Sequence, residues 1–195
     1  MRTRRRYGKV RIIAGEWRGR RISFPESDGL RPTPDRVRET LFNWLSPSLP
    51  GARVLDLFSG SGILGFEALS RGAATVVAVE SNRIAADCLR DSARRLQADG
   101  FDVVVADAMR FLDTTRLGPF DVIFIDPPHA AADYDAICAA VGARGLAAPG
   151  GFVYLEFPGS RAAVFSPPEG WTRHRSSRGG HLVYQLWRPA RLTPD

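Results

Sequence analysis

The stretch FIDPPHAAADY, residues 124–134, brings a carboxylate and an imidazole directly after an apolar run. A strand cannot continue through Pro127 and Pro128, because proline lacks the N–H that a strand ladder needs. Asp126 and His129 are therefore expected beside the end of a buried strand. There the carboxylate and the Pro127 carbonyl could accept hydrogens from an exocyclic amine and hold it in line for reaction, while the imidazole offers a flat face to a base. The segment predicts chemistry on a planar amine, although an ordinary strand end closed by a Pro-Pro turn has the same pattern.

A glycine-rich turn provides a second candidate site. VLDLFSGSGILG places Gly60, Gly62 and Gly65 in the GxGxxG pattern of dinucleotide-binding turns, and Glu80 follows Gly60 by 20 residues. Glycines there let a ligand approach the backbone, and the acid can accept hydrogen bonds from ribose hydroxyls. The pattern alone is compatible with a nicotinamide cofactor, with another adenosine ligand, or with a tight turn that only packs a helix on a strand.

Two further acids favour S-adenosylmethionine over a dinucleotide. Asp56 precedes Gly60 by four residues, and its carboxylate suits the ammonium of a methionine moiety but would repel a pyrophosphate. Asp107 could accept from an adenine amino group, or cap the next helix. With Glu80 and Asp126, these acids fall at the ends of four successive expected strands, where the ligands of such sheets bind. The residues expected to bind the cofactor are Asp56, Phe58, Gly60, Ser61, Gly62, Glu80, Asp107 and Ala108.

These sites need a sheet that places the ends of its strands side by side. From residue 53 onward, short apolar runs alternate with amphipathic stretches typical of helices. The runs are 53–58, 75–80, 102–107, 120–126 and 150–157. Such alternation means βαβ crossovers and a mostly parallel sheet covered on both faces, which is a Rossmann-like α/β fold. Residues 171–188 indicate two more strands joined by a Gly-Gly turn, an antiparallel hairpin that completes a seven-stranded sheet.

The N-terminal part is organised differently. Residues 9–25 alternate around GEWRG like a small β-hairpin, in which Trp17 either packs against the main domain or stacks on a nucleic acid. A helix follows, with Thr33 or Asp35 as candidate caps. We expect a basic arm and hairpin at 1–30, a helix leading into the core at 31–50, and the main domain at 51–195.

The positive charge is concentrated at the N-terminus. Residues 1–38 hold 12 Lys and Arg against 4 Asp and Glu, whereas the whole chain has a formal net charge of +6. All of these cations except Lys9 are arginines, whose planar fork suits phosphate oxygens and can stack on bases. We interpret the region as an arm that binds a polyanion, with nucleic acid the favoured class and a solvated tail the alternative.

Other features argue against several classes of protein. Cys88 and Cys138 are isolated, without CxxC spacing or clustered His, which argues against a disulfide framework or a zinc site and fits a reducing compartment. No apolar run approaches the roughly 18 residues of a membrane span, and no apolar stretch follows the basic N-terminus as in a secretory signal. We therefore expect a cytoplasmic monomer that binds neither metal nor membrane.

Several motifs together resemble a known family. DPPH (126–129) is similar to the [DN]-PP-[FYW] motif of methyltransferases that act on exocyclic amino groups of nucleobases. RIIAGEWRGRRI, LRPTPDRVRETLFNWL and VLDLFSGSGILGFEALSRGA resemble the bacterial 16S rRNA guanine-N2 methyltransferase family along nearly the whole chain. The resemblance implies a class I S-adenosylmethionine-dependent methyltransferase fold with an N-terminal β-hairpin extension. It also implies methylation of one guanine of 16S rRNA in assembled or assembling small ribosomal subunits.

The resemblance and the charge distribution together assign roles to residues. The catalytic group is Asp126, Pro127, Pro128 and His129. The RNA-binding group is Arg4, Arg5, Arg6, Arg18, Arg20, Arg21, Arg31, Thr33, Arg36 and Arg38. His129 departs from the family, whose fourth motif position is Phe, Tyr or Trp. An imidazole stacks with less area, so we expect an altered rate or pH dependence with the function retained.

The residues alone leave other functions open. Guanine and adenine both present an exocyclic amine to Asp126, so an adenine-N6 nucleic-acid methyltransferase would use the same chemistry. A nicotinamide-dependent oxidoreductase is compatible with the glycine pattern, and a catalytically silent RNA-binding assembly factor is compatible with the fold and the charge. Binding of S-adenosylmethionine separates the methyltransferases from these last two, and RNA against DNA acceptors then separates the methyltransferases from each other.

Overall fold

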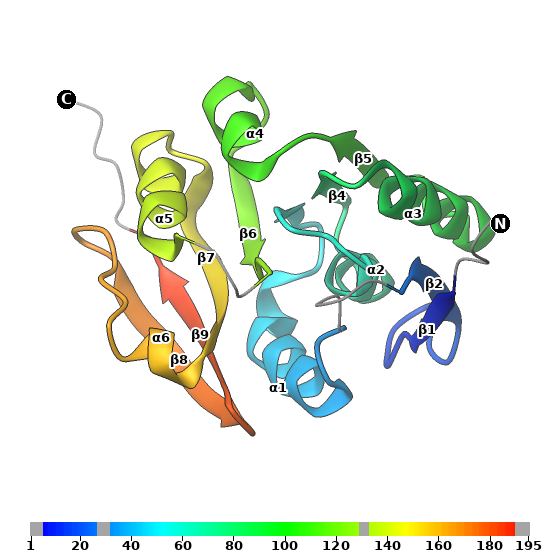
Figure 1. The fold of residues 1–195 in the computed structure, drawn as a ribbon, viewed down its shortest axis with the longest axis horizontal. Helices are drawn as coiled ribbons and strands as arrows, with labels where there is room; N and C mark the ends of the chain where they lie inside the picture. The colour runs from blue at the N-terminus through cyan, green and yellow to red at the C-terminus, as the bar shows by residue number, and fades with distance from the viewer. Residues whose placement is uncertain (1–5, 27–31, 129–132, 190–195) are drawn as a thin grey trace, which may run out of the picture.

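Seven strands form one sheet, in which the order of strands is β5-β4-β3-β6-β7-β9-β8. The computed structural model describes residues 6–26, 32–128 and 133–189. The strands of this sheet are β3 (Arg53–Asp56), β4 (Thr75–Glu80), β5 (Phe101–Val105), β6 (Phe120–Ile125), β7 (Ala147–Pro158), β8 (Thr172–Gly179) and β9 (Leu182–Arg188). Strands β3 to β7 run parallel, whereas β9 pairs antiparallel with both β7 and β8. This arrangement confirms the fold predicted from the sequence (Figure 1).

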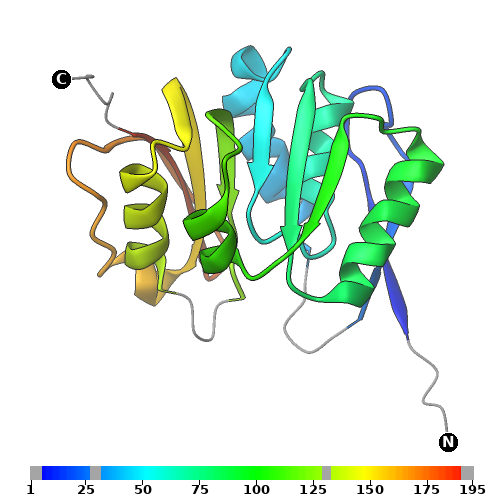
Figure 2. The ribbon, with the colours of Figure 1, turned by 90° about the horizontal axis from the view of Figure 1, so that it is seen from above.

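Helices cover both faces of the sheet. They are α1 (Asp35–Leu45), the 3₁₀ turn η1 (Ser46–Ser48), α2 (Ile63–Ser70), α3 (Arg83–Leu96), α4 (Ala108–Thr114), α5 (Tyr134–Ala143) and α6 (Gly159–Ala162). Buried side chains of α1, α2 and α3 join one apolar cluster, and those of α4 and α5 join a second. Figure 2 shows α4 and α5 on one side of the sheet and α1 and α2 on the other. In the described part of the chain, no helix is long and apolar enough to cross a bilayer.

The central strand β6 is buried on both faces, which explains its uninterrupted apolar sequence from Val122 to Ile125. Val122 and Phe124 belong to one apolar cluster, Ile123 and Ile125 belong to the other, and none of them is exposed. A parallel strand covered by helices on both faces buries both of its alternating sets of side chains. The strand ends at Ile125, so Asp126 lies at the carboxyl edge of the sheet.

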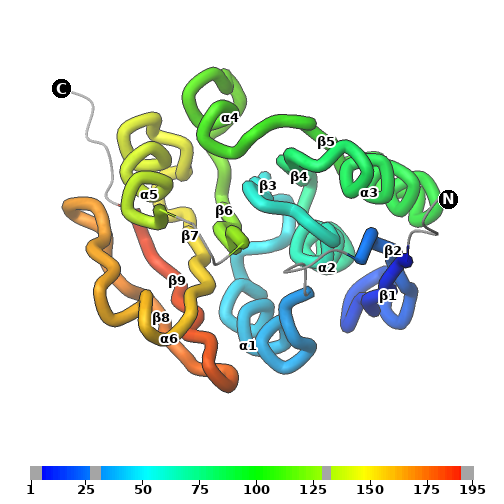
Figure 3. Tube along the Cα trace, viewed as in Figure 1, coloured from blue at the N-terminus to red at the C-terminus, as the bar shows by residue number. Residues whose placement is uncertain are grey.

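The N-terminal hairpin packs onto the main domain. Strands β1 (Tyr7–Arg11) and β2 (Arg21–Pro25) form a separate antiparallel sheet, which lies beside α2 and α3 (Figure 3). Trp17 is only 7% exposed and its backbone N–H donates to Ser70 Oγ at 2.9 Å, so the packing alternative for this tryptophan holds. Gly15 permits the approach, because a Cβ at this position would lie 1.7 Å from the Ser70 carbonyl oxygen.

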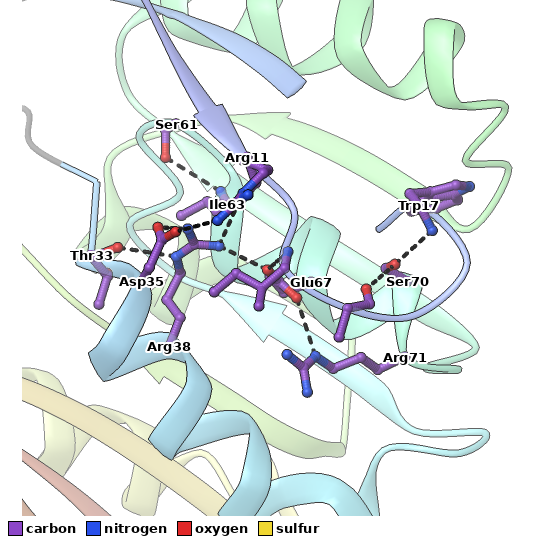
Figure 4. A network of polar contacts seen from close by, with 12 residues as sticks. Arg11, Trp17, Thr33, Asp35, Arg38, Ser61, Ile63, Glu67, Ser70 and Arg71 are labelled. Carbon is purple, nitrogen blue, oxygen red and sulfur yellow. Dashed lines mark hydrogen bonds and ion pairs between the residues drawn. The ribbon is translucent and has the colours of Figure 1, made fainter. Parts of the chain in front are cut away.

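Arg38, expected to contact RNA, is instead completely buried. Its Nη1 donates to Glu67 Oε1 at 2.8 Å and its Nη2 to Asp35 Oδ1 at 2.6 Å. Its Nε donates to the Thr33 carbonyl at 3.1 Å, and Nη1 also donates to the Arg11 carbonyl at 3.0 Å. Burial lowers the pKa of this guanidinium, while the two carboxylates act in the opposite direction. Because all three guanidinium nitrogens donate within the protein, the prediction that Arg38 binds RNA is wrong (Figure 4).

Glu67 is the acidic centre of the same cluster and is also completely buried. Besides Arg38, its Oε1 accepts from the backbone N–H of Ile13, and its Oε2 accepts from Arg71 Nε at 3.1 Å. The cluster therefore ties the hairpin, α1 and α2 together through charged hydrogen bonds. The division of the chain at residues 30 and 50 stays a prediction, although the hairpin shares its apolar cluster with α1 and α2.

The start of α1 differs from the expectation. The N-cap is Pro34, and no side chain caps the helix. The Thr33 hydroxyl instead donates to Asp126 Oδ2 at 3.4 Å, and the Asp35 carboxylate pairs with Arg38. Asp35 Oδ2 also accepts from Arg11 Nη2 of the hairpin at 3.3 Å, so both candidate caps make tertiary contacts that local helix signals do not report. One of these contacts brings the segment before α1 to the predicted catalytic acid.

Candidate active site

A cavity of about 640 Å³ opens at the carboxyl ends of the parallel strands. Its volume is in the range of sites for small molecules and cofactors. The predicted cofactor residues that line it are Asp56, Phe58, Gly60, Ser61, Glu80, Asp107 and Ala108. Predicted substrate and catalytic residues that line it are Thr33, Asp126, Pro127 and Pro128. His129 lies outside the described residues.

Glu80 ends β4 and is held by the backbone. Its Oε2 accepts from the Gly60 N–H at 2.8 Å, and its Oε1 accepts from the Asn82 N–H at 2.7 Å. A carboxylate oxygen has two lone pairs, so each can accept a further hydrogen bond from a ligand. The glycine turn and the acid twenty residues later therefore form one unit, which presents a fixed acceptor of the kind that ribose hydroxyls require.

Gly62 is the one predicted cofactor residue absent from the lining of the cavity. It precedes α2 in a left-handed conformation with φ +76°, and a Cβ there would lie 2.3 Å from Leu89 Cδ2. The turn and the packing of α3 both require glycine at this position. Gly62 thus has a packing role, and its contact with the cofactor stays a prediction.

Asp107 caps a helix, which was one of its two predicted roles, and the contact with an adenine amino group stays a prediction. Its Oδ1 accepts from the Arg110 N–H at 3.0 Å and caps α4. The same residue lines the cavity just beyond β5. A capping carboxylate keeps acceptor capacity, so Asp107 can also face an amino group of a ligand.

Asp56, at the end of β3, has an unsatisfied oxygen. The residue is 3% exposed, and its buried Oδ2 makes no hydrogen bond. Burial, with a contribution from the Glu80 charge, raises the pKa of this carboxyl from its ordinary value to about 7. A buried acceptor without a partner in a cavity wall fits the ammonium of a methionine moiety, because that ligand would supply both the missing hydrogen bond and the missing positive charge. The hydrogen-bond acceptors in the cavity wall therefore fit S-adenosylmethionine.

Replacing Asp56 with asparagine should stabilise the ligand-free protein at pH 8 and not at pH 4. The folded protein holds the Asp56 proton up to about pH 7, whereas the unfolded chain releases it near pH 3.8, so stability is lost as the pH rises between these values. The full cost is on the order of 4 kcal/mol. Asp56→Asn should therefore raise the melting temperature by roughly 5–10 °C at pH 8, and it should weaken binding of S-adenosylmethionine.

Thermal melts at both pH values check this expectation. The same change at the exposed Asp102, on β5, is the control and should leave the melting temperature unchanged at either pH. An equal shift for Asp56→Asn at pH 4 and pH 8 would contradict a raised pKa for Asp56.

Asp126 follows β6 and faces two other acids. The Thr33 hydroxyl donates to its Oδ2 at 3.4 Å. Burial raises the pKa of this carboxyl well above its usual range, and the charges of Glu156 and Asp56 raise it further. The site thus concentrates acidic groups without a balancing cation from the described residues that line it, and a positively charged ligand would favour their ionised forms. In the described part of the chain, no group of His, Cys, Asp and Glu side chains is placed to hold a metal ion.

Glu156 lines the cavity and was missed by the sequence analysis. It is 3% exposed, and its Oε2 accepts from the Tyr154 hydroxyl at 2.8 Å. Burial raises the pKa of its carboxyl. Its position could have been predicted in the same way as those of the other acids, because Glu156 stands near the carboxyl end of the next parallel strand, β7.

The arginines predicted to bind RNA do not line the cavity where the structure describes them. Arg6, Arg18, Arg20, Arg21 and Arg36 are exposed. Arg20 Nη2 donates to the Arg95 carbonyl at 3.0 Å, and Arg6 Nε lies 3.4 Å from Glu26 Oε2. The remaining members, Arg4, Arg5 and Arg31, lie outside the described residues. These exposed side chains are available to phosphates, in contrast to Arg38.

The chain is similar to known methyltransferases in both sequence and structure. The family described as "Conserved hypothetical protein 95" matches residues 10–188. The ribosomal RNA small subunit methyltransferase D of Escherichia coli K12 is 39% identical over 180 residues, which cover 92% of this chain and 90% of that protein. The Haemophilus influenzae protein of the same name is 38% identical over 183 residues, with coverage of 92% and 94%. The solved structure of Escherichia coli yhhF has a TM-score of 0.83 and 38% identity, covering 94% of this chain and 100% of that one. The fold is that of class I methyltransferases.

Proposed function

The chain belongs to the family of ribosomal RNA small subunit methyltransferase D, and from this premise we propose that it methylates the N2 amine of a guanine in 16S rRNA, with S-adenosylmethionine as the donor. The observation that carries the proposal is the convergence of acids from the ends of adjacent strands in one cavity. The proposed acceptor is 16S rRNA in the assembled or assembling small ribosomal subunit. We further propose that the enzyme acts in the cytoplasm as a monomer.

Three acids fit the polar groups of the proposed cofactor. When bound, S-adenosylmethionine supplies a methyl group on a positively charged sulfur that leaves as a neutral thioether. In our proposal Asp56 accepts from the ammonium, Glu80 from the ribose hydroxyls and Asp107 from the adenine amino group. The walls between these acids come from Phe58, Gly60, Ser61 and Ala108.

The acceptor amine requires positioning more than acid–base chemistry. The lone pair of an exocyclic amine is delocalised into the ring, so the amine is a poor nucleophile. Asp126 and the Pro127 carbonyl accept its hydrogens and hold it in line with the methyl group. The raised pKa of Asp126 also lets this carboxylate take the proton that the methylated amine releases. Stacking of the base on His129 stays a prediction.

Access to the amine requires a base that is splayed out of its stack, as in an RNA loop. Four exposed arginines of the hairpin and of α1 are candidates for contacts with phosphates. Arg18, Arg20 and Arg21 belong to the hairpin, and Arg36 lies in the first turn of α1. We propose that they hold phosphates around the target base.

Replacing Arg18, Arg21 and Arg36 with glutamine should weaken RNA binding and flatten its salt dependence. Each phosphate contact contributes roughly −0.7 to the slope of log affinity against log salt on single-stranded RNA. The triple variant should therefore lose about 2 from that slope, measured by filter binding between 50 and 300 mM salt. Arg116→Gln is the control, since this exposed arginine precedes β6 and lies at the opposite edge of the sheet from the cavity. An unchanged slope in the triple variant would contradict the assignment.

Methyl transfer from labelled S-adenosylmethionine tests the proposed function. Small subunits lacking base methylation, free 16S rRNA and duplex DNA are offered as separate acceptors. We expect label in the rRNA of the subunits and none in DNA. Label in DNA alone would support an adenine-N6 DNA methyltransferase. Cofactor binding without transfer to any of the three would support a silent RNA-binding protein.

A further inference from the structure

Glu156 stands directly beside the proposed catalytic acid. In the parallel pairing of β6 and β7, Ile125 lies opposite Leu155, so the next pair along the strands is Asp126 and Glu156. Neighbouring strands are about 4.8 Å apart. Both acids line the cavity, which places two carboxylates within reach of one edge of a small planar ring.

Both side chains project from the same face of the sheet. Side chains alternate along a strand, so Asp126 shares a face with Phe124, and Glu156 shares a face with Tyr154. The rings of Phe124 and Tyr154 touch edge to face at 6.1 Å between centroids and belong to the apolar cluster on the side of α1. Thr33, at the start of α1, donates to Asp126 from the same side.

The position of Glu156 is fixed by two tyrosines. The Tyr154 hydroxyl donates to its Oε2 at 2.8 Å, and the Tyr134 hydroxyl donates to its backbone carbonyl at 2.8 Å. The residue is 3% exposed. A buried carboxylate in a ligand cavity, held in place and unused by the cofactor contacts described above, is available for recognition of the acceptor.

The neighbour of the amine distinguishes guanine from adenine. In guanine the N2 amine is flanked by N1–H, a second donor on the same edge. In adenine the N6 amine is flanked by an unprotonated N1, which is an acceptor. An ionised carboxylate only accepts, so a second carboxylate beside Asp126 complements guanine and repels adenine.

We propose that Glu156 selects guanine by accepting a hydrogen bond from N1–H while Asp126 accepts from the N2 amine. The inference rests on the proposed function and explains a choice that the sequence alone leaves open. Donation from N1–H and from the Tyr154 hydroxyl both favour the ionised carboxylate. A site built to pair with a donor discriminates strongly against an analogue that lacks it, because the buried acceptor is then left unpaired.

The test uses 2-aminopurine, which keeps the N2 amine but presents N1 as an acceptor. Small subunits reconstituted with 16S rRNA that carries guanine or 2-aminopurine at the nucleotide that the wild-type enzyme modifies are compared in single-turnover methyl transfer. The wild-type enzyme should methylate guanine at least about 100-fold faster. In Glu156→Gln the amide can present either oxygen or NH₂, so the preference should fall to below about 10-fold.

Asp126→Asn is the matched control, since it makes the same change on the neighbouring strand. It should slow both substrates together and keep the preference for guanine. Calorimetric binding of S-adenosylmethionine and a thermal melt establish that each variant is folded.

Two results would overturn the inference while leaving the proposed function standing. One is methylation of 2-aminopurine by the wild-type enzyme as fast as methylation of guanine, a result that is measured without any variant. The other is a Glu156→Gln enzyme, folded and cofactor-binding, with the wild-type preference. Absence of methylated guanine with the wild-type enzyme would overturn both the inference and the proposed function.

Discussion

Asp126→Asn should lower the rate of methyl transfer about 1,000-fold and leave the affinity for S-adenosylmethionine within about three-fold of the wild type. The substitution keeps the shape of the side chain, and the amide oxygen can still accept the hydrogen bond from the Thr33 hydroxyl. It removes the charge that accepts from the amine and the base that takes its proton. The acids assigned to the cofactor, Asp56, Glu80 and Asp107, are untouched.

The rate is measured in a single turnover with labelled cofactor, and the affinity by calorimetry. Asp113→Asn, on the exposed side of α4, is the control and should match the wild type in both. A rate for Asp126→Asn within ten-fold of the wild type would contradict the catalytic assignment. Because burial, and after it the charges of Glu156 and Asp56, raise the pKa of Asp126, the variant should also melt higher than the wild type at pH 8.

Arg38→Met should destabilise the protein by about 3–5 kcal/mol, because it leaves the buried Glu67 carboxylate without its shortest ionic partner. The ion pair between Arg38 and Glu67 is completely buried and joins α1 to α2, and the Arg11 carbonyl of the hairpin depends on the same guanidinium. A loss of this size corresponds to roughly 10 °C or more in melting temperature.

Chemical denaturation of three variants checks this value. Asp87→Asn breaks the exposed pair of Arg90 and Asp87 and should cost less than about 1 kcal/mol. The double variant Arg38→Met, Glu67→Leu should be more stable than Arg38→Met alone, since it removes a buried carboxylate that has lost one of its two ionic partners. If Arg38→Met melted like the wild type and only weakened RNA binding, the residue would have the role that its sequence motif suggested.

The centre of the sheet was predictable because its parallel strands have to be apolar on both faces. The run from Val122 to Ile125 is buried among two clusters of helices, and its end marks the edge where ligands bind. The same rule placed Asp56, Glu80, Asp107 and Asp126 at one edge, and all four line one cavity. A parallel sheet brings distant sequence positions together by a fixed geometry, so the site followed from the strand ends.

The departures arise where a side chain is used by a distant partner. Arg38 looked like its exposed neighbour Arg36. Helical periodicity places Arg38 on the buried face of α1, where it contacts Glu67, 29 positions away in the sequence. Gly62 fits a ligand-binding pattern but is required by Leu89 of α3. Glu156 was missed because its strand was read only for its apolar residues.

The identity of the methylated nucleoside tests the central claim most directly. Small subunits lacking base methylation are incubated with the wild-type enzyme and labelled S-adenosylmethionine, and their rRNA is digested to nucleosides and separated by chromatography with mass detection. We expect one labelled product, N2-methylguanosine, and its loss with Asp126→Asn. Labelled N6-methyladenosine, or label in no nucleoside while the cofactor still binds, would contradict the proposed function.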